Sequence, residues 1–285
     1  METLVGVIAF MVCVNVFALV YRSARSRRES AVLGFAMRIG LPLNDEVLDA
    51  VDRRVWHGLL GLSIGCLVAL AGLALLLIWP QFIPTGGAGF AVGSILWAAM
   101  AIGGAVSALE QFASPAPGHQ RFARAKTPGL TDYVHPGWVW GTAARTAIAT
   151  ILTAAMLLGV RGGAVDVGLP LPGLVALTIL ALFGAIGAAL LSRRLLAVPQ
   201  PVSGELDLQW DDALRGYALR QLWIASIALS SAAIAVSYNW MVDATSIASY
   251  FGVVITLIPM LLFTLRPGKR SQRRLWSPVS TGIPG

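Results

Sequence analysis

Charged residues are scarce in this chain. Asp, Glu, Lys and Arg together make up 12% of its 285 residues, while hydrophobic residues make up 56%. An average soluble domain is about 25% charged, so this chain has roughly half the usual share. Such a surface would not keep a soluble protein dispersed. The composition therefore excludes a soluble enzyme and a disordered chain, and it predicts an integral membrane protein.

Cysteine and histidine are also rare. Cys13 and Cys66 both lie in apolar stretches and neither belongs to a CxxC motif, which excludes a disulfide-built secreted domain and a redox pair. The three histidines have no HxxxH or HExxH partner and no Cys or acidic residue at ligand spacing. A P-loop, a GxSxG motif and a Rossmann glycine pattern are absent as well. We therefore expect no metal site, no cofactor and no ATPase activity within this chain.

Long apolar stretches, in contrast, recur along the whole sequence. A membrane-spanning helix needs roughly 20 mostly apolar residues, whereas barrel strands are alternating segments of about ten. The sequence predicts a single domain over 1–285 that is an all-α polytopic integral membrane protein. Its seven transmembrane helices form one lone helix followed by three hairpins. The predicted spans are 3–20, 57–79, 90–109, 138–160, 172–191, 222–241 and 247–265.

Basic residues fall almost entirely on one side of this predicted topology. Of the 21 Lys and Arg residues, 19 follow the first, third or fifth span or lie in the tail 266–285. Arg145 lies within a span, and only Arg161 lies in the opposite connections. The positive-inside rule then predicts an N-terminus outside and a basic, cytoplasmic C-terminal tail. The net charge of +7 is thereby explained without nucleic acid, for which the chain has no basic module interleaved with aromatic residues.

The residue pattern of the segment 22–56, which we expect to be cytoplasmic and amphipathic, predicts two helices between the first two spans. Glu29–Ile39 mixes apolar residues with a basic edge, which suits a helix lying at the membrane surface. Gly40-Leu41-Pro42 breaks this helix, and Asn44 is placed to cap a second one. The second helix has acidic residues in its first turn and Arg53 and Arg54 in its last, as the helix dipole favours.

A related pattern precedes the sixth span. Asp211 and Arg215 are four residues apart, as are Asp49 and Arg53, a spacing that supports ion pairs on a helix. A shift of 167 residues also superposes Asp45 on Asp212, Arg53 on Arg220 and Trp56 on Trp223. Two explanations fit this similarity: a duplicated hairpin, as in many transporters, or a common requirement for a charged helix start where a chain enters a membrane.

Small residues four apart are common in the spans. Gly61 and Gly65 are one such pair, and Gly104 and Ala108 are another. Pairs of this kind let two membrane helices approach closely. We expect them to serve packing within the chain rather than a dimer interface.

One charged residue lies well inside a predicted span. Charges there are costly and mark functional sites by default. Arg145, about two turns into the span 138–160, either extends toward the cytoplasmic headgroups or faces an anionic substrate. Glu110 ends the third span on the same side and would pair with it, and Trp97 in mid-span is either a packing residue or a pocket wall. These three are the candidate substrate-binding residues, and no catalytic residue is predicted.

These features favour a non-enzymatic, permease-like or accessory subunit of a transport system in a bacterial cytoplasmic membrane. No carboxylate lies at the centre of a span, so the energy for transport would come from a partner such as a cytoplasmic ATPase or another membrane subunit. The alternatives are a membrane-embedded enzyme acting on a lipid or isoprenoid phosphate, with Glu110 or His135 moving protons, and a structural or sensory scaffold. The candidate partner-contact residues are Asp45, Asp49, Arg53, Asp211 and Arg215.

Overall fold

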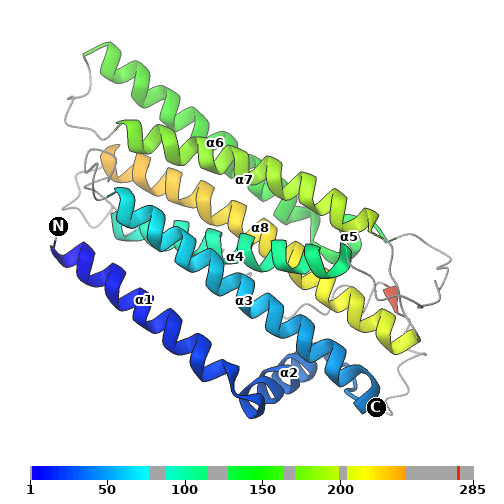
Figure 1. Cartoon of the computed structure of the whole chain (residues 1–285). Helices are drawn as coiled ribbons and strands as arrows, with labels where there is room; N and C mark the ends of the chain where they lie inside the picture. The colour runs from blue at the N-terminus through cyan, green and yellow to red at the C-terminus, as the bar shows by residue number, and fades with distance from the viewer. Residues whose placement is uncertain are drawn as a thin grey trace.

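A computed structural model of the chain describes residues 2–76, 88–113, 128–163, 171–198, 204–241 and 275–276. Within these ranges the chain is helical and contains no strand. Figure 1 shows the long helices lying side by side in one bundle, with α1 (Glu2–Ser23) at one edge and α6 (Pro136–Arg161) at the other. The all-helical class predicted from the sequence is therefore confirmed for the described residues.

Five of the described helices are long and apolar enough to cross a membrane. They contain the predicted third to sixth spans and residues 57–76 of the second, which makes a multi-pass membrane protein plausible. The first predicted span lies in α1, and α1 passes the same test only together with α2 (Arg25–Ile39), to which it is bent by 92°. The predicted span 247–265 lies outside the described residues. The other four of the five helices, besides α6, are α3 (Asp45–Leu76), α4 (Ala88–Ala113), α7 (Leu171–Ala197) and α8 (Glu205–Met241).

The junction between α2 and α3 forms where the sequence predicts it. Helix α2 ends at Ile39, and Gly40 follows with a φ of 78°, a left-handed conformation that glycine adopts without a steric penalty. The carbonyl of Asn44 then accepts the first backbone hydrogen bonds of α3, from the amides of Val47 and Leu48. Both the predicted break and the predicted helix start are confirmed. The predicted end of this second helix is wrong, because α3 continues without a break to Leu76 and so Arg53 and Arg54 are not in its last turn.

Helix α2 divides its apolar residues between the protein and its surroundings. Val32 and Ala36 are buried against α3 and the beginning of α8, whereas Leu33 and Met37 are 50% and 76% exposed. The indole of Trp210 on α8 donates a hydrogen bond to the carbonyl of Pro42, which fixes the α2–α3 turn to the bundle. Helix α2 thus has apolar side chains on its outer side too. This suits a helix at the membrane surface, the position that the sequence predicts for it.

Helix α8 occupies the middle of the bundle. In its most apolar window 83% of the residues are buried, whereas the corresponding share in the other four long helices is between 22% and 33%. It packs against α4, α6 and α7, partly through alanines such as Ala225 and Ala228 that allow close contact. The outer helices expose large apolar side chains, Phe183 on α7 at 66% for example, as helices facing lipid do.

Glycines bring α3 and α4 into backbone contact. A Cβ added at Gly61 would collide with the carbonyl oxygen of Gly103, and one added at Gly65 would collide with that of Ala99. The expectation that these small residues pack helices within the chain is confirmed for Gly61 and Gly65.

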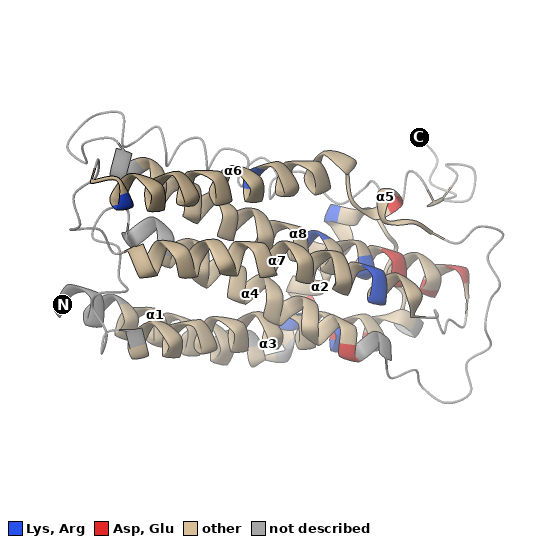
Figure 2. Cartoon of the chain, turned by 90° about the horizontal axis from the view of Figure 1, so that it is seen from above, with Lys and Arg blue, Asp and Glu red and all other residues tan. Residues whose placement is uncertain are grey.

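Charged residues concentrate at one end of the bundle, where α2, the short helix α5 (Leu130–Tyr133) and the first turns of α3 and α8 lie (Figure 2). This is the end that the sequence-based prediction expects to face the cytoplasm. We call it the charged end below.

Candidate polar sites on helix α8

A buried ion-pair network lies on α8 at the charged end. Asp211 and Arg215 are 0% and 2% exposed, and the Nε of Arg215 donates to Oδ2 of Asp211 at 2.8 Å. The other carboxylate oxygen, Oδ1, accepts from Nη1 of Arg54 on α3 at 3.1 Å. Nη1 of Arg215 also donates to the carbonyls of Leu195 and Val198 at the end of α7, where a cation complements the helix dipole. The network therefore joins α3, α7 and α8.

The neighbouring acid, Asp212, holds a different set of groups. Its Oδ1 accepts from the hydroxyl of Tyr133 in α5 at 2.7 Å, and its Oδ2 accepts from the indole of Trp276 at 3.1 Å. Asp212 is 0% exposed, so these bonds replace the water that a carboxylate normally requires. Asp211 and Asp212 thus tie three other parts of the chain to the charged end of α8, and Arg215 adds the end of α7.

The predicted partner-contact residues have different surroundings from one another. The Asp211–Arg215 pair expected from the spacing is present, but both residues are enclosed by the chain itself. On α3, Arg53 donates from Nε to the backbone carbonyl of Asp49 at 3.4 Å rather than to its carboxylate. Asp49 and Arg53 are exposed, and Asp45 is the first residue of α3. A role in contacting a partner stays a prediction for all five.

The two segments related by the 167-residue shift share neither a helix start nor an environment. Asp45 is the first residue of α3, whereas its counterpart Asp212 lies seven residues after Glu205, the first residue of α8. Arg220 lies over the ring of Trp138 at 5.8 Å, whereas its counterpart Arg53 is exposed. Trp223 is 4% exposed, and Trp56 lies beneath the guanidinium of Arg28 at 5.4 Å.

Arg145 points into the bundle. Its Nη1 donates to the hydroxyl of Ser231 on α8 at 2.7 Å, and Ser231 is 1% exposed. The pairing with Glu110 expected from the sequence is not what the structure shows, because Glu110 is exposed at the end of α4. Within the described ranges no carboxylate forms an ion pair with Arg145. Trp97 is 38% exposed on α4.

Hydroxyl groups line the buried side of α8 and its neighbours. Ser226 donates to the carbonyl of Gly184 on α7 at 2.8 Å, and Thr153 and Thr178 share a hydrogen bond of 2.7 Å between α6 and α7. Ser230 and Ser237 bond to carbonyls of their own helix. Sequence reasoning missed these residues because serine and threonine hardly lower the hydropathy of an apolar window.

The histidine considered for proton transfer has a local structural role. Nδ1 of His135 accepts from the amide of Gly137 at 3.0 Å, and Pro136 begins α6. This is the arrangement of a helix N-cap followed by proline. Among the described residues no group of three or more His, Cys, Asp or Glu is placed to hold a metal ion.

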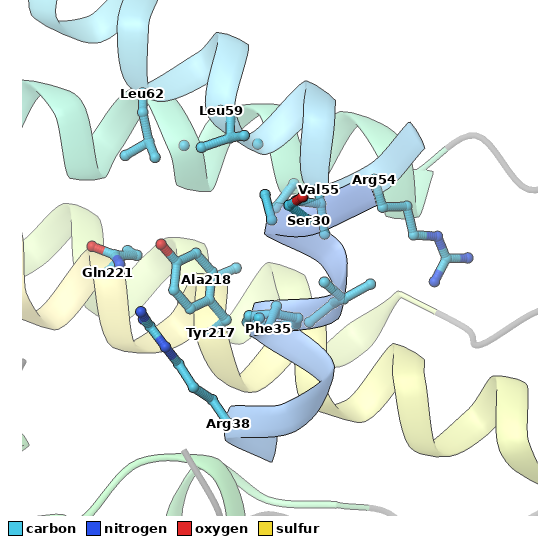
Figure 3. A pocket seen from close by; sticks show the side chains of 16 residues that line it. Ser30, Phe35, Arg38, Arg54, Val55, Leu59, Leu62, Tyr217, Ala218 and Gln221 are labelled. Carbon is cyan, nitrogen blue, oxygen red and sulfur yellow. The ribbon is translucent and has the colours of Figure 1, made fainter. Parts of the chain in front are cut away.

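A cavity of about 400 Å³ lies between α2, α3, α4 and α8, beside the buried network. Figure 3 shows Leu59 and Leu62 of α3 extending toward it and Phe35 and Tyr217 on its other side. The sequence did not predict this cavity, because it forms only when α2 folds back beside the span that follows it.

No protein-family model, curated protein or solved structure matches this chain.

Proposed function

We propose that this protein is a non-enzymatic, permease-like or accessory subunit of a transport system in a bacterial cytoplasmic membrane. It spans the membrane seven times, and its solute is anionic. The observation that carries the proposal is the guanidinium of Arg145, held on Ser231 in the interior of the bundle. Of the two interpretations of Arg145, contact with an anionic solute and extension toward the headgroups, the hydrogen bond supports the first.

The depth of this hydrogen bond supports the same choice. Arg145 is about two turns inside the span 138–160, and Ser231 is about two and a half turns inside the span 222–241. An arginine that extended toward the cytoplasmic headgroups would point back toward its own helix start. Here the guanidinium instead binds a hydroxyl at least as deep as its own Cα, where an unpaired cation is costly and attracts an anion.

The charged end supports a mechanical link to a cytoplasmic partner. The buried network around Asp211 and Asp212 connects α3, α5 and α7 to α8, and α8 carries Ser231 farther along. A force applied at that end would reach the Arg145 site through one continuous helix. The exposed pair Asp49 and Arg53 lies on the same end and would receive the partner.

Anion binding to the purified protein tests the Arg145 site. Protein in lipid nanodiscs would be titrated with chloride, phosphate, sulfate and short carboxylates while thermal unfolding is followed. We expect one anion class to raise the unfolding temperature of the native chain, because a ligand that binds only the folded state stabilises it. Arg145→Gln removes the cation and should abolish the shift.

Arg161→Gln is the matched control, since Arg161 is exposed at the far end of the same helix. It should leave the anion-induced shift unchanged. The proposal fails if none of these anions stabilises the native chain, or if Arg145→Gln responds to them as the native chain does.

Co-purification tests the partner. Gentle detergent extraction from the native membrane, followed by intact-complex mass spectrometry, should recover a stoichiometric second protein with a nucleotide-binding site. The charge-reversed variant Asp49→Lys with Arg53→Glu should lose it, whereas Arg193→Glu, an exposed change at the end of α7, should retain it. Recovery of the native chain always alone contradicts this part of the proposal.

A further inference from the structure

The cavity between α2, α3, α4 and α8 has two chemically different parts. Its inner walls are apolar and come from three helices, with Leu59 and Leu62 on α3, Gly104 on α4 and Ala218 on α8. Toward its other side lie Arg38, Tyr217 and Gln221. In Figure 3 the guanidinium of Arg38 points to the side where the Tyr217 hydroxyl and the Gln221 amide lie.

The two arginines that line the cavity are engaged differently. Arg54 donates to the buried carboxylate of Asp211, so its charge is largely compensated. Arg38 is exposed, and no described residue forms an ion pair or a hydrogen bond with it. A cation beside an apolar cavity, with a hydroxyl and an amide nearby, complements a ligand that has an anionic head and a hydrocarbon body.

The cavity lies at the depth where a lipid changes from headgroup to acyl chain. Its lining residues Gly58, Ala108 and Gln221 each stand within one residue of a cytoplasmic boundary of the predicted spans 57–79, 90–109 and 222–241. These boundaries come from apolar runs in the sequence and the cavity from the packing, so the two observations are independent. Arg38 is on the helix expected at the membrane surface, and Leu59 and Leu62 extend into the span.

Glycines keep the cavity open. Gly34 on α2 and Gly58 on α3 both line it, and a Cβ added at either would have nothing within 4 Å. Unlike Gly61 and Gly65, these two glycines are therefore not required for contact between helices. They leave room for a foreign group.

We propose that this cavity binds one anionic phospholipid of the cytoplasmic leaflet. The phosphate is held by Arg38 with Tyr217 and Gln221, and part of one acyl chain lies along Leu59, Leu62 and Gly104. A lipid fits better than a soluble anion, because most of the lining is apolar and would gain nothing from inorganic phosphate. The site is separate from Arg145 and stands or falls independently of the transport role.

Lipid counting by native mass spectrometry tests this proposal. The full chain, stripped in detergent, would be titrated with phosphatidylglycerol, with phosphatidylcholine of the same acyl chains and with inorganic phosphate. We expect one phosphatidylglycerol to bind at least about fivefold more tightly than phosphatidylcholine, the ratio equivalent to about 1 kcal/mol for a basic residue near an anionic surface. Inorganic phosphate at millimolar concentration should not displace it.

Two variants and two matched controls locate the site. Arg38→Gln should remove the preference for phosphatidylglycerol while phosphatidylcholine binding persists, because only the charge is lost. Gly58→Leu fills the cavity and should weaken the binding of both lipids. Arg193→Gln, an exposed charge at the same end, and Gly72→Leu, an exposed glycine on the same helix with open space around it, should bind lipid like the native chain.

The remaining outcomes overturn the proposal. Equal affinity of the native chain for the two lipids would show that no anionic headgroup site exists, and equal losses in Arg38→Gln and Arg193→Gln would assign the preference to overall charge. Displacement of the lipid by inorganic phosphate alone would identify a soluble-anion site instead. Because Arg38 is exposed, its substitution is not expected to unfold the chain, so the headgroup result holds even if Gly58→Leu misfolds.

Discussion

Asp211 is the residue on which the charged end depends most. Its carboxylate accepts from both Arg215 and Arg54, and Arg215 is almost fully enclosed. Removing one partner of a buried ion pair costs about 3–5 kcal/mol, because the other charge is left without compensation. We expect Asp211→Asn to lower the free energy of unfolding by about 3 kcal/mol. Unfolding in SDS, followed by circular dichroism, measures the difference.

Asp49→Asn is the control at this scale. Asp49 is also an acid four residues before an arginine, but it is exposed and Arg53 bonds to its backbone carbonyl. Its substitution should change the free energy of unfolding by less than about 0.5 kcal/mol. Similar losses for the two variants would mean that Asp211 contributes no more than a surface charge.

Residue spacing alone did not determine whether an ion pair forms or whether it is buried. The same four-residue spacing occurs at Asp49–Arg53 and at Asp211–Arg215, yet only the second forms a side-chain ion pair, and only the second is enclosed. Burial of the Asp211–Arg215 pair depends on partners from other helices, because Asp211 accepts from Arg54 on α3 and Arg215 donates to a carbonyl at the end of α7. For the same reason the sequence paired Arg145 with Glu110, the nearest acid at that depth, whereas the fold supplies Ser231.

At the scale of the element, the contact between α3 and α4 depends on the absence of side chains. A larger residue at Gly65 would meet the backbone of Ala99 and Met100, which cannot rotate away as a side chain would. Overpacking usually costs about 1–3 kcal/mol, and backbone contact places this site at the upper end. We expect Gly65→Leu to destabilise the protein by about 3 kcal/mol or to prevent its recovery in folded form.

Gly72→Leu provides the comparison on the same helix. Gly72 is exposed, with nothing near the position of an added Cβ, so leucine should be accepted within about 0.5 kcal/mol. Size-exclusion chromatography and SDS unfolding of the two variants separate the effects. If Gly65→Leu were as stable as Gly72→Leu, the claim that α3 and α4 are in backbone contact at Gly65 would be contradicted.

The boundary between α2 and α3 followed the sequence closely, since it depends on local chemistry. Gly40 ends α2 and Asn44 precedes α3 because a left-handed glycine and a residue that accepts the first helical hydrogen bonds act within one turn. The cavity beside α2 was not predictable in this way. The cavity depends on which face α2 turns toward α8. Because Leu33 and Met37 make the other face apolar as well, the sequence does not show which face packs against the bundle.

At the scale of the whole molecule, one described contact and the end of α8 bear on the number of spans. Trp276 donates to Asp212, near the start of α8, whereas α8 ends at Met241 about 40 Å farther along its axis. The chain therefore leaves α8 at one end of the bundle and is found again at the other. The predicted span 247–265 lies between these two points in the sequence, and a helix of this length covers roughly the 30 Å of a hydrocarbon core.

Reporter fusions test this topology directly. A reporter active only in the cytoplasm should be active after Trp276 and inactive before Glu2, because an odd number of spans separates the two ends. Insertions in the connections 114–127 and 164–170 serve as internal references, and we expect activity in the first, which is basic, and none in the second. Activity at both ends of the chain would mean an even number of spans. In that case the charged end could still face the cytoplasm, but α1 would not cross the membrane as a separate span, and its 92° bend into α2 would have to lie within the cytoplasmic boundary.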